Sequence, residues 1–211
     1  MQPSELQQEA LSERTADHDI LPIFHGRWSP RAMDGTPLSR EELHTVLEAA
    51  RWAPSSYNEQ EWRFIYALAG TPHFDRLLGF LVEQNQAWCR RAGALIHVSA
   101  RTTFVKNEKP NSCYSFDSGL ATQNLLLQAA SMNLVSHAMV GFDKPASMTG
   151  LDIPKGFEPQ CMIALGHRGD VDALPDALRE LESPNDRKPL SEIACEGTFG
   201  FDEDALRPDP T

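Results

Sequence analysis

A chain of 211 residues, 41% hydrophobic and 23% charged, fits one globular domain that buries enough surface to fold without disulfides or a structural metal. Its net charge of −11 is concentrated at the ends, since residues 1–19 and 196–211 carry −4 each and 20–195 carry only −3. Because nucleic-acid binding needs a basic face and a membrane span needs a long apolar run, we expect neither nucleic acid nor membrane as a partner.

The cysteine pattern and the N-terminal composition predict compartment and organisation. Four widely separated cysteines, with no apolar segment before residue 20, predict a cytoplasmic protein in a reducing compartment. We expect a polar acidic arm or frayed helix over residues 1–19. One domain should follow over 20–195, with an acidic tail over 196–211.

The first strong helix is predicted to begin at Ser39. Ser39 and Glu42 match the S-x-x-E capping box, in which each side chain satisfies a free backbone amide at the helix start. Pro54 should end the helix. Between them, apolar residues at i, i+3, i+4 and i+7 form one stripe: Leu43, Val46, Leu47 and Ala50.

Beyond this helix, strands and helices are predicted to alternate. Branched and aromatic runs indicate strands, and apolar-periodic runs indicate helices. The order is strand 62–68, helix 72–86, strand 94–100, loop 103–115, helix 116–132, strand 134–140, helix 144–150, strand 160–165 and helix 175–181. The helix over 116–132 is apolar nearly all round and should be buried on several sides. The pattern predicts an α/β or α+β fold in layers.

Several common catalytic signatures are absent from the sequence. It contains no G-x-G-x-x-G after a strand, no P-loop, no G-x-S-x-G and no H-E-x-x-H, which argues against a Rossmann nicotinamide site. The seven histidines include no pair at i, i+4. We therefore assign no metal ligands.

Three polar stretches stand out. The first is R-W-S-P-R at 27–31, whose arginines could bind phosphate bidentately. The second, around 53–62, offers Ser, Asn and Gln side chains that could meet a flat heterocycle or a ribityl chain. The third is the basic pair in 184–190. Taken singly, the first is better interpreted as a solvated basic turn and the second as an ordinary Pro/Ser/Asn turn, and the third can be a solvated loop.

Taken in order, these stretches resemble the nitroreductase family. The resemblance is carried by R-W-S-P-R, by A-A-R-W-A-P-S-S-x-N-x-Q-x-W-R-F after the capped helix, and by R-K-P-L at 187–190. Residues 117–128 resemble the family's central helix, and 137–143 its strand-to-helix turn. Residues 153–167 resemble its next turn and strand. The match covers roughly residues 24–195.

The resemblance implies a fold, a cofactor and an activity. The fold is α+β, a three-layer sandwich with a mixed, mainly antiparallel sheet flanked by helices. It forms a homodimer with FMN at the interface. Electrons pass from NADH or NADPH to a small-molecule acceptor such as a nitroaromatic, quinone or enone. We expect ping-pong turnover with no catalytic side chain.

The resemblance also implies the cofactor-binding residues. Arg27, Ser29 and Arg31 would hold the phosphate and ribityl end, and Arg187 and Lys188 would close on the phosphate. Other positions would meet the ribityl chain or the ring, or flank those that do: Trp28, Pro54, Ser55, Ser56, Asn58, Gln60, Met139, Val140 and Gly141.

Two departures and two alternatives accompany this interpretation. Glu61 stands where the family often has proline, and Asn185 where a second basic residue is common. Within enzymes, the acceptor could instead be flavin itself or a halogenated aromatic. Outside enzymes, the same fold could serve as a non-catalytic flavin-binding or ligand-sensing module.

Overall fold

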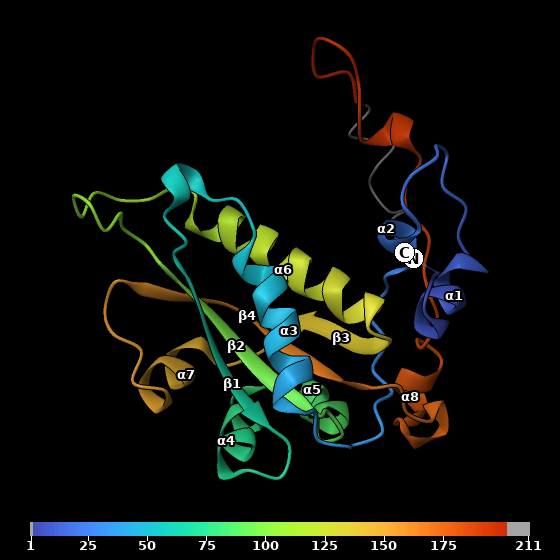
Figure 1. The fold of residues 1–211 in the computed structure, drawn as a ribbon, viewed down its shortest axis with the longest axis horizontal. Coiled ribbons are helices and arrows are strands. Elements are labelled where there is room, and N and C mark those ends of the chain that lie inside the picture. The colour runs from blue at the N-terminus through green and yellow to red at the C-terminus, as the bar shows by residue number, and fades with distance from the viewer. Residues whose placement is uncertain (1, 202–211) are drawn as a thin grey trace, which may run out of the picture.

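One four-stranded antiparallel sheet organises the chain in the computed structural model, which describes residues 2–201 (Figure 1). The strands lie in the order β1-β2-β4-β3. Their bounds are β1 Trp62–Leu68, β2 Ala94–Arg101, β3 Leu134–Met139 and β4 Phe157–His167. In the central ladder, Ile96 pairs with Ile163, and the register of β2 against β4 shifts between Val98 and Ser99.

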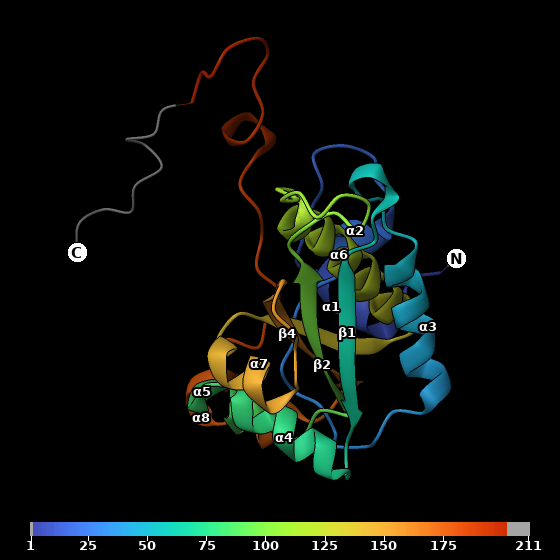
Figure 2. The same cartoon turned by 90° about the vertical axis from the view of Figure 1, so that its left-hand side faces the viewer.

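Helices cover both faces of this sheet, which makes three layers (Figure 2). The helix bounds are α3 Arg40–Arg51, α4 Pro72–Phe80, α5 Glu83–Cys89, α6 Tyr114–Ser131, α7 Lys144–Gly150 and α8 Asp176–Arg179. In β2, Ile96 packs with the apolar faces of α3 and α6, whereas Leu95 packs with α4 and α5. Strand β2 is therefore buried on both sides. This arrangement confirms the α+β class, and the ladders among the described residues are antiparallel.

The helix predicted over 72–86 is wrong as a single element. Helix α4 ends at Phe80 and α5 begins at Glu83, with Leu81 and Val82 in extended conformation between them. The Val82 N–H donates to the Gly141 carbonyl at 3.1 Å, and the Asp143 N–H donates to the Phe80 carbonyl at 2.8 Å. Pairing with a segment sixty residues away thus interrupts a run that favours a helix locally.

The other predicted elements agree more closely. The strand over 62–68 is confirmed, and the helix predicted over 116–132 is α6. Strand β4 extends beyond the predicted 160–165, and the last helix, predicted over 175–181, is a single turn, α8. Short 3₁₀ turns occupy Ser56–Asn58, Val171–Ala173 and Leu190–Glu192.

The N-terminal segment contains a packed helix, α1 (Glu5–Leu11), followed by α2 (Pro22–Gly26). Ser4 and Gln7 form a capping box at the start of α1, and Leu6 lies in the core. The Ser4 hydroxyl donates to the Ala130 carbonyl at 2.8 Å, which ties α1 to the last turn of α6. A capped and packed helix therefore replaces the frayed one expected. The boundaries of arm, domain and tail stay a prediction.

No helix among residues 2–201 combines the length and the apolar character needed to cross a bilayer.

Candidate functional site

A cluster of three arginines forms where the N-terminal segment meets the late part of the chain. Arg14 is buried, and its guanidinium donates to the carbonyls of His25 at 3.0 Å, Arg27 at 2.9 Å and Asn185 at 2.7 Å. These bonds join the segment before Arg27 to the segment before Arg187. Arg14 therefore holds the two predicted phosphate-binding stretches together.

Arg27 and Arg187 lie close enough to repel each other. Burial first, and then the charge of Arg187, lower the pKa of Arg27. Burial, Arg187 and Arg27, in that order, lower the pKa of Arg14. The Arg27 Nη1 donates to the Ser29 hydroxyl at 3.1 Å, but its Nε is buried without a partner. A cluster of cations with an orphaned buried donor matches what a bound anion would satisfy.

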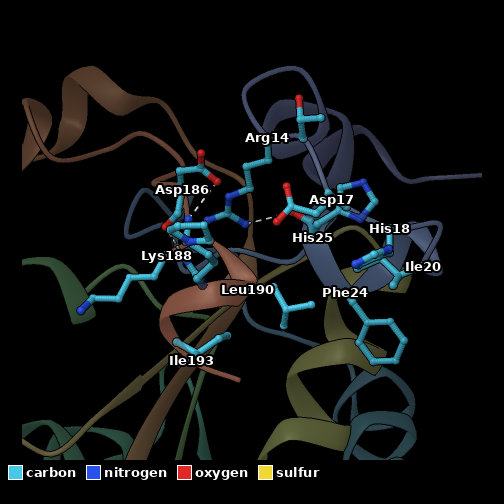
Figure 3. A pocket seen from close by; sticks show the side chains of 14 residues that line it. Arg14, Asp17, His18, Ile20, Phe24, His25, Asp186, Lys188, Leu190 and Ile193 are labelled. Atoms are coloured by element: carbon cyan, nitrogen blue, oxygen red, sulfur yellow. Dashed lines mark hydrogen bonds between the residues drawn. The ribbon is translucent and has the colours of Figure 1, made fainter. Parts of the chain in front are cut away.

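A cavity of about 470 Å³ opens beside this cluster. In Figure 3, Arg14 and Asp186 lie at its upper edge, and Phe24, Leu190 and Ile193 lie lower. The cavity thus combines a charged edge with an apolar wall. Its lining comes from two parts of the chain: Arg14, Thr15, Ala16, Asp17, His18, Ile20, Phe24 and His25 in one, and Asp186, Arg187, Lys188, Pro189, Leu190 and Ile193 in the other.

The backbone of residues 27–31 is fixed by a buried carboxylate. The Glu182 side chain is fully buried, and it accepts the N–H groups of Arg31 at 2.9 Å and Ala32 at 2.8 Å. It also pairs with Arg168, whose guanidinium lies 5.2 Å from the centre of the Trp28 ring. Trp28 itself is in the core, where its Nε1 donates to the Leu6 carbonyl at 3.3 Å. Its side chain can therefore position this segment from behind.

His137 of β3 supports the same segment from the sheet. Its Nδ1 lies 3.2 Å from the Pro30 carbonyl, and its ring centre lies 4.8 Å from that of Trp88. Burial first, and then the charge of Arg31, lower the pKa of His137. The imidazole is therefore neutral at physiological pH and donates its Nδ1 proton to Pro30.

The turn over 55–60 has an unusual backbone. Tyr57, Asn58 and Gln60 have left-handed φ angles of 53°, 58° and 52°. The Ser56 N–H donates to Asp117 Oδ2 at 2.8 Å, and the Ser55 hydroxyl accepts the Gln60 N–H at 3.0 Å. Pro54, Asn58 and Gln60 are exposed. Left-handed residues with a Cβ persist where surrounding contacts hold them, often at ligand sites.

The segment after β3 presents Val140 to solvent, with 75% of its surface exposed. The next carbonyl, that of Gly141, accepts from Val82 N–H and Asn85 Nδ2, both at 3.1 Å. A Cβ at position 141 would come within 2.8 Å of Asn85 Nδ2, so glycine permits this close approach. Met139 is buried beneath, 3.6 Å from the Cys89 sulfur.

The predicted segments 27–31 and 55–60 lie at opposite ends of α6, while 139–141 packs against α5 and Val82. Ser56 binds Asp117 in the first turn of α6, whereas Ser4, on the α1 side with Trp28, binds Ala130 in its last turn. Asp117 and Ala130 are thirteen positions apart in α6, which is about 20 Å along the helix axis. Figure 1 shows the same separation, with the cyan turn at the upper left and α1 and α2 at the right. One chain alone does not bring the two groups together.

The comparisons with known proteins identify the family. The family model described as "Nitroreductase family" matches residues 25–167, about two thirds of the chain. The chain belongs to the nitroreductase family.

Several known proteins are similar to this chain. A solved structure described as an oxidoreductase containing FMN is 40% identical, with a TM-score of 0.86, covering 90% of this chain and 97% of its own. A second, a "putative nitroreductase in complex with fmn" from Desulfovibrio desulfuricans, is 25% identical with a TM-score of 0.68, covering 88% and 100%. "Putative NAD(P)H nitroreductase Spy0809" of Streptococcus pyogenes is 22% identical over 82% of this chain and 97% of its own.

Two residues that shape this candidate site were missed by sequence reasoning. Arg14 is the one basic residue of the acidic segment 1–19, a signal that could have drawn attention to it. Glu182 lies in an ordinary acidic context and carries no local signal. Lys188 of the predicted basic pair is paired with Glu192 at 3.7 Å. Among residues 2–201, no three His, Cys, Asp or Glu side chains gather as a metal site would need.

Proposed function

We propose that the protein is an FMN-dependent oxidoreductase that transfers electrons from NADH or NADPH to a small electrophilic acceptor such as a nitroaromatic, quinone or enone. The observation that carries this proposal is the arginine cluster with the buried, unpartnered Arg27 Nε. It fits a phosphate that is held inside the protein. Membership of the nitroreductase family and similarity to two FMN-containing structures support FMN as the group that bears this phosphate.

The phosphate would be held by the side chains of Arg27, Ser29, Arg31, Arg187 and Lys188. Arg14 has all its described bonds to protein acceptors, so we assign it the role of positioning Arg27 and Arg187. Trp28 likewise has a positioning role, because its side chain is buried in the core beneath residues 27–31. Charged donors in a fixed array bind a phosphate more strongly than mobile ones because less side-chain order is lost on binding.

The ribityl chain and ring would be met by Ser56, Asn58, Gln60 and the Val140–Gly141 backbone. Because the turn 55–60 and the arginine cluster lie at opposite ends of α6, we propose that the protein acts as a homodimer. A second copy would bring the turn of one chain toward the arginine cluster of the other. Phe116 in the first turn of α6 is an exposed apolar side chain near the turn, and it suits burial in such an interface.

The chemistry that FMN supplies when bound is the storage of two electrons between donor and acceptor. The residues of this chain bind and orient that group. We infer ping-pong turnover in which donor and acceptor use one open face in turn, since the sequence carries no separate dinucleotide motif. His137, neutral and bonded to Pro30, holds the binding segment and transfers no proton to substrate.

The phosphate assignment is tested by FMN titration of purified variants. Each charge-assisted bond contributes about 1.5–3 kcal/mol, so Arg27→Ala and Arg187→Ala should each weaken FMN binding roughly tenfold or more. Arg40→Ala removes an exposed arginine at the start of α3 and is the matched control. FMN binding as tight in both site variants as in the parent would overturn the assignment.

The mechanism is tested by kinetics of His137→Gln. A catalytic acid or base typically contributes 10²–10⁴-fold, so the rate at which NAD(P)H bleaches bound flavin should stay within about tenfold of the parent. Steady-state measurements with donor and acceptor both varied should give parallel double-reciprocal lines. Intersecting lines, or a thousandfold loss in the variant, would contradict this mechanism.

A further inference from the structure

A pair of buried carboxyl groups lies between the turn 55–60 and α6. Glu61 directly precedes β1 and is 1% exposed, and Asp117 in the first turn of α6 is 3% exposed. Asn111 Nδ2 donates to Glu61 Oε1 at 2.8 Å, while Glu61 Oε2 is buried with no donor facing it. Glu61 also lies near Asp117, whose carboxyl group contributes to raising the Glu61 pKa.

Two carboxylates in such contact cannot both stay ionised, because like charges in a buried site repel strongly. Asp117 is the better place for the negative charge. Its Oδ2 accepts the Ser56 N–H at 2.8 Å, and the first turn of a helix stabilises an anion. Burial first, and then Asp117, raise the pKa of Glu61. A proton on Glu61 Oε2 would turn the unpartnered oxygen into a donor.

We propose that Glu61 and Asp117 share one proton, donated from Glu61 Oε2 to Asp117, and that this shared proton holds the turn 55–60 in place. The two carboxyl groups and the Ser56 N–H are called the clasp below. Ser56 near the start of the turn is bonded to Asp117, and Glu61 directly follows its end. The proton therefore joins the two ends of a turn whose left-handed residues need outside support.

The charged and titratable side chains around the clasp are bonded to groups other than its two carboxyls. Arg101 at the end of β2 directs its Nε to the Thr103 hydroxyl at 3.3 Å, and Arg63 of β1 donates to the Gln60 carbonyl at 2.9 Å. Glu59 in the turn accepts the Val105 N–H at 2.6 Å. At the start of α6, the Tyr114 hydroxyl donates to Glu158 at 2.6 Å, and Cys113 follows Asn111 as the N-cap. Within residues 2–201, no Lys or Arg is paired with either carboxyl of the clasp.

The clasp makes the turn sensitive to rising pH. Because the folded protein keeps the Glu61 proton above the ordinary value of 4.5, where the unfolded chain loses it, stability falls as pH rises from 4.5 to the raised pKa of folded Glu61. Above that pKa the two carboxylates repel, and the turn should loosen. Glu61 is thus a positioning residue, and its effect on FMN rests on the proposed function of the turn.

The proton itself is tested without any cofactor, by infrared spectroscopy of the flavin-free protein at pH 6. The parent should show the carbonyl band of a buried protonated carboxylic acid. Glu61→Gln should lack it, because the amide donates to Asp117 without titrating. Asp117→Asn should lose the band at a lower pH than the parent, because the contribution of Asp117 to the Glu61 pKa is removed while burial still raises it. Glu41→Gln, an exposed carboxyl of α3, should keep it. No band in the parent that depends on Glu61 would overturn the clasp.

The coupling to the site is tested by FMN titration from pH 6 to 9, expressed as the ratio of parent to Glu61→Gln dissociation constants, which cancels the titration of the phosphate itself. Above the Glu61 pKa this ratio should rise by up to tenfold per pH unit, the limit for one proton. A ratio that stays constant across pH would overturn the positioning role. If neither protein binds FMN, the proposed function fails, and the infrared band still decides whether the proton is shared.

Discussion

The two ends of α6 hold their parts of the site in different ways. The segment 27–31 is fixed by bonds to Arg14, Glu182 and His137. Each of these residues bonds to a position of the segment that is at least 13 residues away in sequence. The turn 55–60 has a strained backbone. It is held by the bond from Ser56 to Asp117 and by bonds of Gln60 and Glu59 to residues within or near the turn. The first region is preorganised by tertiary contacts, which suits a phosphate. The second depends on local geometry and on one proton.

The two regions should also respond to pH in opposite senses. Burial lowers the pKa of His137, so the region around 27–31 is expected to weaken in acid. Burial and Asp117 raise the pKa of Glu61, so the turn is expected to weaken as pH rises. A single chain therefore carries an acid-sensitive and a base-sensitive anchor for one proposed cofactor.

The largest effect should come from removing the buried anchor of the first region. Glu182→Ala leaves Arg168 without one of its partners and two backbone N–H groups unsatisfied. Removing one member of a buried pair costs about 3–5 kcal/mol. We expect about 3 kcal/mol here, because Arg168 keeps Glu9 at 3.0 Å. Urea unfolding measures it, with exposed Glu180→Ala as control. A loss of unfolding free energy below about 1 kcal/mol, the contribution of an exposed ion pair, would mean that Glu182 does not anchor the first region.

The next effect is the acid response of His137. The unfolded chain binds a proton below the ordinary value of 6.5 while folded His137 does not, so stability is lost as pH falls below 6.5. The unfolding constant should change by up to tenfold per pH unit on this account. Burial also lowers the pKa of His97, to about 4, so in the parent both His137 and His97 contribute to the loss of stability below pH 6.5.

Comparing the pH dependence of stability in the parent and in His137→Gln separates the contribution of His137 from that of His97. Stability curves measured by denaturant unfolding from pH 7 to pH 5 should be shallower for the variant. Identical slopes for the two proteins would show that His137 is not buried in its neutral form, and that the first region lacks this anchor.

The smallest effect concerns strain in the turn. Tyr57 is 91% exposed with a left-handed φ, so its Cβ is disfavoured and its ring is hardly packed, apart from an edge contact with Phe104. Tyr57→Gly should relieve about 1 kcal/mol of strain, offset in part by the entropy of glycine, for a net gain of about 0.5 kcal/mol. Thermal unfolding measures it. Asn58→Gly should gain less, since asparagine tolerates this conformation. A clear loss at Tyr57 would mean that the ring, rather than the backbone, holds the turn.

How far sequence reasoning reached differs between these regions for a physical reason. The helix α3 was predictable because its capping box is local: the Ser39 N–H donates to Glu42 and the Glu42 N–H to Ser39. The break at Leu81–Val82 was not, because it depends on pairing with 141–143. Likewise R-W-S-P-R was recognisable from its residues, whereas Glu182 binds Arg31 across 151 positions of sequence.

The clasp illustrates the same limit. Glu61 was noticed in the sequence only as a departure from a common proline. Its burial, its unpartnered Oε2 and its contact with Asp117 emerge only from the fold, since fifty-six positions separate the two carboxyl groups. Patterns within one element predict local structure, but two acidic residues give no local sign that they will meet.

The central claim is that this chain binds FMN and passes electrons through it. The most direct measurement is the absorption spectrum of the purified protein under anaerobic conditions, before and after NADH or NADPH is added. The account predicts a bound, noncovalent flavin whose visible absorption bleaches rapidly with at least one donor and returns when an acceptor such as a quinone is supplied. A protein that binds no flavin, or whose bound flavin resists both donors, would contradict it.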